Sequence, residues 1–101
     1  MAQPVLAQIA QIAQIDNRWD ISGDVVIGAV PALLEVSKSL SFIDNATVDF
    51  ANVTDIDTST ISLILEWKRR AQKENKPLKF VNLPANLTTL TQLYGVAELI
   101  N

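Results

Sequence analysis

The chain has 101 residues, the length of one domain, and its 49% of hydrophobic residues are enough to form a core. It contains neither cysteine nor histidine, which excludes disulfide scaffolds, thiolate zinc sites and iron–sulfur clusters, as well as classical Ser/His/Asp and Cys/His catalysis. The net charge of −3 at pH 7 argues against a dedicated nucleic-acid-binding protein.

A triplet repeat, Ala-Gln-Ile, occupies residues 7–15. A period of three matches neither a strand nor a helix, and we interpret about Val5–Ile15 as an extended edge strand. Asp16 and Asn17 are typical turn residues, so Arg18–Ser22, ending at Gly23, is expected to return as the second strand of a hairpin. No charged leader precedes Arg18, and we therefore expect no export signal.

A helix and a short strand are expected next. The apolar residues recur with the 3.6-residue period of a helix over about Gly28–Leu40, and Ile27 falls on the same, core-facing side. Pro31 lies in the first turn, where its missing amide has no intrahelical partner. This apolar stretch is too short to span a membrane. Ala46–Phe50 is predicted to be a strand that is buried on both faces except at Asp49.

The strongest helix of the sequence is expected over roughly Ser59–Asn75, followed by Pro77. Residues 58–60 are Thr-Ser-Thr and supply capping side chains. The apolar residues cover about half of the helical wheel, which is wider than one core-facing stripe needs. Six basic residues lie within positions 68–79; they are suited either to an anionic partner or to an ordinary solvated face.

The last elements complete an α/β pattern. Leu78–Val81 is predicted to be a strand, and Pro84 to open a final helix that ends before Gly95. The expected order is ββαβαβα, and short strands joined through helices imply crossovers within one sheet, with helices packed on a face. The sequence therefore predicts a small α/β sandwich, a single domain over residues 1–101 in which residues 1–15 form an N-terminal strand or extension.

Residues 53–60 run from the end of a strand into the start of a helix, where free amides and the helix dipole favour an anion. A phosphate on a hydroxyl there would gain amide hydrogen bonds, although Asp55 and Asp57 would repel it. Alternatively, Thr58 or Ser59 simply caps the helix. Catalysis by the Asp55–Asp57 pair would need a metal ion or a pocket. We expect these to be solvated carboxylates, and we expect neither a metal nor a cofactor.

The sequence around this junction resembles the STAS domain of anti-sigma-factor antagonists and sulfate transporters. The resemblance covers roughly residues 18–100 and centres on Asp57-Thr58-Ser59-Thr60 between a strand and an Ile/Leu-rich helix. Within that family the chain is most similar to the MlaB, or toluene-tolerance, type, the small STAS subunit of Mla phospholipid-transport ABC systems. The supporting motifs are Ile21-Ser22-Gly23-Asp24, Pro31, Val48-Asp49-Phe50 and Leu90-Thr91-Gln92-Leu93-Tyr94-Gly95-Val96.

The resemblance implies a protein that is not an enzyme and that presents the motif to a partner. In the Mla type, the threonine matching Thr58 lies at the contact with the ATPase subunit, within a complex that also holds permease and substrate-binding subunits and maintains outer-membrane lipid asymmetry. The implied location is cytoplasmic, peripheral to the inner membrane through that complex, without nucleic acid. The expected partner-binding residues are Asp57, Thr58, Ser59, Thr60, Ile61 and Leu65.

The anti-sigma-factor antagonist branch gives an alternative, a kinase-controlled partner switch in which the serine matching Ser59 is the phospho-acceptor. Two residues depart from the family patterns. Thr60 stands where the antagonist motif has glycine, so the backbone there is less free, and Ser59 stands where the Mla type usually has glycine. Trp67 is either an anchor for the partner or a core residue.

Overall fold

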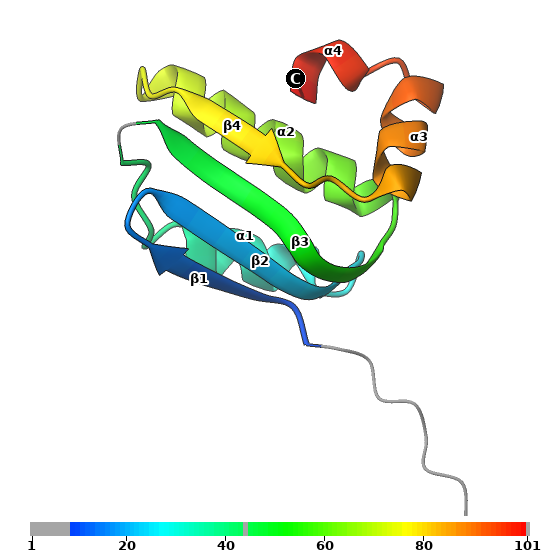
Figure 1. Cartoon of the computed structure of the whole chain (residues 1–101), viewed down its shortest axis with the longest axis horizontal. Coiled ribbons are helices and arrows are strands. Elements are labelled where there is room, and N and C mark those ends of the chain that lie inside the picture. The colour runs from blue at the N-terminus through cyan, green and yellow to red at the C-terminus, as the bar shows by residue number, and fades with distance from the viewer. Residues whose placement is uncertain (1–8, 44, 101) are drawn as a thin grey trace, which may run out of the picture.

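The computed structural model describes residues 9–43 and 45–100, which form a four-stranded sheet and four helices (Figure 1). The expected order ββαβαβα is confirmed, with one further short helix at the C-terminal end. The elements are β1 (Gln11–Ile15), β2 (Arg18–Val25), α1 (Val30–Ser37), β3 (Ala46–Ile56), α2 (Thr58–Lys73), β4 (Leu78–Val81), α3 (Ala85–Leu93) and α4 (Ala97–Ile100).

The sheet has the order β1-β2-β3-β4, so strands that follow one another in sequence are neighbours in space. β1 and β2 form the expected antiparallel hairpin, with Ile15 opposite Arg18 across the turn. The pairs β2–β3 and β3–β4 are parallel, and their crossover helices α1 and α2 lie on the same face of the sheet (Figure 1). α3 lies beyond the end of β4, and α4 turns back from it to contact α2.

The N-terminal strand is shorter than expected. β1 begins at Gln11, and the part of the expected strand before Ile9 lies outside the described residues. β2 does not end at Gly23 but continues to Val25, with a register shift after the glycine. Gly23 has φ +85°, and a Cβ atom at this position would lie 2.2 Å from the carbonyl oxygen of Ile9. The glycine therefore marks a bulge and a close crossing of two segments.

β3 continues beyond Phe50 to Ile56, so much of the expected loop is strand. Its first residues alternate between buried and half-buried, with Thr47 and Asp49 half-buried. The expectation of burial on both faces is wrong, because the helices cover only one face of the sheet (Figure 1).

The helices differ from expectation mainly at their ends. α1 is confined to Val30–Ser37, with Pro31 in its first turn as expected, and Ile27 lies in the loop before it. α2 begins one residue earlier than expected. Gly95, with φ +69°, follows the end of α3 as predicted. Among the described residues, no helix has the length and hydropathy required to cross a membrane.

The core lies between the sheet and the layer of α1 and α2. Trp19 and Trp67 are fully buried, and their rings meet edge to face with centroids 5.5 Å apart. Phe42 stacks on the other side of Trp19 at 4.7 Å. Trp67 is therefore a core residue, and the interpretation of this side chain as an exposed anchor is wrong.

Candidate partner-binding surface

Asp57 is the N-cap of α2, at the point where β3 ends. Its carboxylate accepts a hydrogen bond from the amide of Ser59 at 2.9 Å, and its own amide donates to the hydroxyl of Thr60 at 3.3 Å. The amide of Thr60 also donates to this carboxylate, and the reciprocal pair of bonds between Asp57 and Thr60 is a capping box. The expectation that Thr58 or Ser59 caps the helix is wrong, because Asp57 still has an extended backbone whereas both following residues are already helical.

Two further hydrogen bonds join this cap to the end of β2 and the loop that follows it. The second carboxylate oxygen of Asp57 accepts from the amide of Ile27 at 2.9 Å, and the Thr60 hydroxyl donates to the carbonyl of Val25 at 2.6 Å. β2 and β3 are parallel and end side by side, with Val25 opposite Ile56. The strand ends and the first turn of α2 are thus held as one unit.

The charge of Asp57 is part of this arrangement. Desolvation by burial acts to raise the pKa of Asp57, but hydrogen bonds from the Ser59 hydroxyl and from the amides of Ile27, Ser59 and Thr60 together lower its pKa below the ordinary value. The carboxylate is therefore ionised at neutral pH, where it is also favoured by the positive end of the α2 dipole. Its role is that of a structural acceptor.

The structure separates the six residues expected to contact a partner. Thr58 is exposed, and Asp57, Ser59 and Leu65 are half-buried. Thr60 and Ile61 are only 0% and 7% exposed, because the former is bonded to the end of β2 and the latter packs in the core. A direct contact role for Thr60 does not fit this structure, whereas Ile61, although largely buried, lines a surface groove beside Thr58.

Ser59, the expected phospho-acceptor, donates its hydroxyl to the carboxylate of Asp57. A phosphate on this oxygen would replace that hydrogen bond with repulsion between two anions. Asp55 is exposed and accepts from the neighbouring amide of Ile56 at 2.9 Å. No cluster of three or more His, Cys, Asp or Glu side chains suited to a metal ion occurs within residues 9–43 and 45–100.

A surface groove of about 570 Å³ lies around Thr58. Three segments line it: the loop before α1 through Ile27, the first turns of α2, and the residues after α3. The α2 residues are Thr58, Ser59, Ile61 and Ser62, and those after α3 are Tyr94 and Val96. Ile27 and Tyr94 are large side chains that are 74% and 59% exposed. We call the four exposed side chains Ile27, Thr58, Ser62 and Tyr94 the docking surface.

Sequence reasoning missed three members of the docking surface: Ile27, Ser62 and Tyr94. It placed Ile27 on the core-facing side of α1, but the helix begins only at Val30 and leaves Ile27 in a loop. It placed Tyr94 in the final helix and used it as part of a family motif. No local feature distinguishes Tyr94 from the core-facing apolar residues of this helix.

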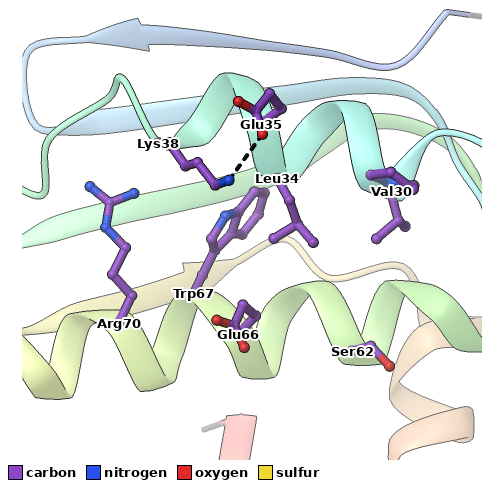
Figure 2. A pocket seen from close by; sticks show the side chains of 9 residues that line it. Val30, Leu34, Glu35, Lys38, Ser62, Glu66, Trp67 and Arg70 are labelled. Atoms are coloured by element: carbon purple, nitrogen blue, oxygen red, sulfur yellow. Dashed lines mark hydrogen bonds and ion pairs between the residues drawn. The ribbon is translucent and has the colours of Figure 1, made fainter.

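A second groove, of about 520 Å³, lies between α1 and α2 (Figure 2). Its apolar lining includes Val30 and Leu34, with Trp67 between the helices. Each charged residue of its lining has an ion-pair partner within the chain: Glu35 with Lys38, Glu66 with Arg69, and Arg70 with Glu74. This groove is therefore a seam between two helices whose rim charges are already satisfied.

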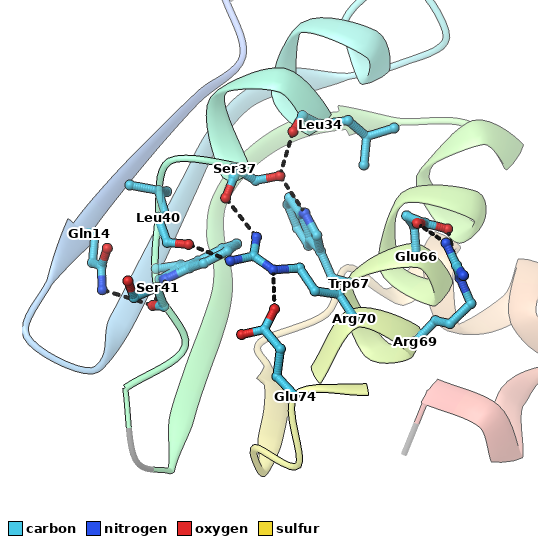
Figure 3. Close-up of polar contacts among 11 residues, drawn as sticks. Gln14, Leu34, Ser37, Leu40, Ser41, Glu66, Trp67, Arg69, Arg70 and Glu74 are labelled. Carbon is cyan, nitrogen blue, oxygen red and sulfur yellow. Dashed lines mark hydrogen bonds and ion pairs between the residues drawn. The ribbon is translucent and has the colours of Figure 1, made fainter. Parts of the chain in front are cut away.

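The basic segment of residues 68–79 does not form a uniform exposed face. Figure 3 shows the guanidinium of Arg70 directed toward the end of α1, where it donates to the carbonyls of Ser37 at 2.7 Å and Leu40 at 2.5 Å. It also lies 4.6 Å from the ring centroid of Phe42. Arg69 instead pairs with Glu66 at the surface. At least Arg70 is thus a structural residue.

Comparison with known proteins gives the family and the fold. A family model described as "Mlab, STAS domain" matches residues 10–101. No curated protein was found to match the chain. The solved structure of the anti-sigma factor antagonist SpoIIAA in its unphosphorylated form is similar, with a TM-score of 0.66 and 15% identity over 88% of this chain and 83% of that one.

A second solved structure, described as a crystal structure analysis of Mglu, has a TM-score of 0.55 and 22% identity over 74% of this chain. The present chain covers only 20% of the length of that protein. Because both sequence identities are below 25%, these two similarities are evidence for the fold and not for the function.

Proposed function

The chain belongs to the STAS domain family, and we propose that it is the non-catalytic STAS subunit of an Mla-like ABC system for phospholipid transport. In this proposal it binds the ATPase subunit at the cytoplasmic face of the inner membrane, in a complex with permease and substrate-binding subunits that maintains outer-membrane lipid asymmetry. The proposal is supported by the description of the matching family model and by the geometry around Thr58.

The observation that carries the proposal is the exposure of Thr58 within the docking surface. Its hydroxyl-bearing side chain lines the same groove as two large exposed apolar side chains, Ile27 and Tyr94, which come from distant parts of the chain. Protein interfaces are enriched in aromatic and other large side chains at their centre, surrounded by a polar rim. The Asp57 cap fixes the backbone of Ile27 against the first turn of α2, so little ordering of this part of the surface is needed on binding.

In the proposed mechanism, the STAS subunit acts on the ATPase subunit only by binding to it. A subunit without chemistry of its own influences an ATPase by binding one of its conformations more tightly than another, and the size of the effect equals the difference between those affinities. The STAS subunit then stabilises the assembled form of the transporter.

The proposal is tested by co-expression with the ATPase and measurement of the amount that co-purifies. Thr58→Glu is expected to lower the affinity about ten-fold or more, because an acidic chain is introduced into an apolar contact. Thr58→Ala should weaken binding less. Both variants should fold, since a carboxylate in the first turn suits the dipole of α2.

Thr88→Glu is the matched control, because it adds the same charge at an exposed position in the first half of α3, away from the lining of the groove. Unchanged co-purification of both Thr58 variants, with the control also unchanged, would show that Thr58 is not at the contact.

A kinase-controlled partner switch is the second candidate, favoured by the position of the Ser59 hydroxyl at the start of α2. Incubation with a cognate kinase, followed by intact-mass measurement of the wild type and of Ser59→Ala, distinguishes the two candidates. A single phosphate that disappears in Ser59→Ala supports the switch. The interaction between Ser59 and the carboxylate of Asp57 leads us to expect no phosphate.

A further inference from the structure

The outer edge of β1 is open among the described residues, in which β1 pairs only with β2. The hairpin closes at the pair Ile15 and Arg18. In an antiparallel hairpin with a two-residue turn, the backbone hydrogen bonds alternate from the closing pair. The amides and carbonyls of Ile12 and Gln14 therefore point away from β2, toward this open edge.

The two edges of the sheet differ in how they are protected. β4, at the other edge, is short, carries Lys79 and follows Lys76-Pro77. Charged side chains and proline are the usual devices that stop an edge strand from pairing with another chain. β1, Gln11–Ile15, contains no charged residue and no proline. One edge of the sheet is thus protected against strand pairing and the other is not.

The triplet repeat adds exposed apolar surface beside this edge. Strand side chains alternate between faces with a period of two, so isoleucines spaced by three fall on opposite faces. Ile12 is half-buried on the helix side, whereas Ile15 is 53% exposed on the other. Ile9, just before the strand, is 79% exposed. Exposed Val36 of α1 lines a shallow groove with Ile12.

We propose that this edge is a homodimer interface, in which β1 pairs antiparallel with β1 of a second copy about a two-fold axis at Ala13. Full overlap of the five-residue strand places Ala13 opposite Ala13, Ile12 opposite Gln14 and Gln11 opposite Ile15. This register pairs the outward-pointing backbone groups of Ile12 in one copy with those of Gln14 in the other. The two four-stranded sheets then become one continuous sheet across the dimer.

A second copy fits this edge because the match is self-complementary. In a two-fold interface each residue pair away from the axis occurs twice. A favourable contact between the two β1 strands therefore contributes twice to the stability of the dimer. No charged side chain lies on β1, and small exposed Ala13 stands at the axis, where the two chains approach most closely.

The interface is tested by sedimentation of the full chain over a wide range of concentration. The wild type is expected to shift from the mass of one chain to that of two as concentration rises. Ala13→Lys should remain monomeric, with the dissociation constant raised at least about ten-fold, because two lysines face each other at the axis. Within one chain the new lysine lies opposite Asp20, so the hairpin is retained.

Mixing provides a readout that a folding defect cannot imitate. Ala13→Glu faces Asp20 within its own chain, so its native fold is first checked by circular dichroism. Folded Ala13→Glu alone should also be monomeric, but an equal mixture with Ala13→Lys should form a heterodimer, because opposite charges meet at the axis. Gln92→Lys, which adds the same charge on α3, should dimerise like the wild type. A wild type that stays monomeric at every concentration, or a mixture that forms no heterodimer while the wild type dimerises, overturns the proposal.

This inference is independent of the proposed function. Ala13 lies outside the docking surface, so its variants should co-purify with the ATPase as the wild type does, and Thr58→Glu should dimerise normally.

Discussion

Asp57 caps α2, a role that the sequence analysis had assigned to the hydroxyl side chains of Thr58 or Ser59. Its extended backbone at the end of β3 lets the carboxylate reach both the first turn of α2 and the amide of Ile27. Thr60 completes the arrangement from inside the helix. The Thr-Ser-Thr segment thus has three different roles: Thr58 is exposed, Ser59 binds the cap, and Thr60 is a buried link.

Replacement of Asp57 by asparagine should weaken the fold in a manner that depends on pH. Asp57→Asn keeps an oxygen acceptor but removes the charge, and we expect the free energy of unfolding to fall by about 1 kcal/mol at neutral pH. The pKa of Asp57 is lowered in the folded state from its ordinary value of 3.8. Its stabilising contribution is therefore present above about pH 4 and is lost as the pH falls through the folded-state pKa.

Denaturant unfolding of the wild type and Asp57→Asn over a series of pH values measures this contribution. The stability difference between the two proteins should shrink on acidification. Asp49 also has a lowered pKa, because the Asn82 side chain and the Ala51 amide donate to it, but it is present in both proteins and cancels in the difference. A difference that stays constant from about pH 7 to pH 3 would rule out this role for the Asp57 charge.

At the scale of the elements, Arg70 connects α2 to the segment between α1 and β3. Its guanidinium binds the carbonyls of Ser37 and Leu40 and pairs with Glu74 (Figure 3). It also packs over the ring of Phe42. Nearby, the Trp67 indole donates to the Ser37 hydroxyl at 3.0 Å. The carbonyls at a helix end need partners, and here a side chain from another helix supplies them.

Arg70→Ala should therefore destabilise the protein by about 2–3 kcal/mol, because buried carbonyls lose charge-assisted hydrogen bonds and the aromatic cluster loses its cover. Thermal unfolding should show a clear fall in Tm. Hydrogen exchange should quicken most in residues 37–42. Arg69→Ala is the matched control, since Arg69 pairs only at the surface with Glu66. Equal effects of the two substitutions would show that the position of the guanidinium does not matter.

The element order could be predicted from the sequence because it depends on local signals. Pro31, the turn at Asp16-Asn17 and Gly95 each mark a boundary by their own backbone preferences, and all three stand where expected. The ends of β2 and β3 could not be predicted in this way. Their extension depends on pairing with each other and on the crossing of Ile9 over Gly23, which are contacts between distant parts of the chain.

At the scale of the whole molecule, the docking surface is a product of topology. Parallel β2 and β3 end at the same edge, which brings Ile27 beside Thr58, and the path of the chain after α3 adds Tyr94. The sequence indicated Thr58 because it lies in a local motif. Ile27 and Tyr94 could be recognised only after the fold had gathered three segments, since nothing local distinguishes them from core residues.

If the three segments act as one surface, substitutions in each should affect the same binding event. Ile27→Ser and Tyr94→Ala remove exposed side chains and should leave the free energy of unfolding nearly unchanged. Each should weaken co-purification with the ATPase, Tyr94→Ala by about ten-fold or more if the ring is an anchor. Leu99→Ser, at another exposed apolar position outside the groove, is the matched control. Loss of binding in Thr58→Glu, together with normal binding in both Ile27→Ser and Tyr94→Ala, would confine the contact to α2 and remove the loop and the C-terminal segment from it.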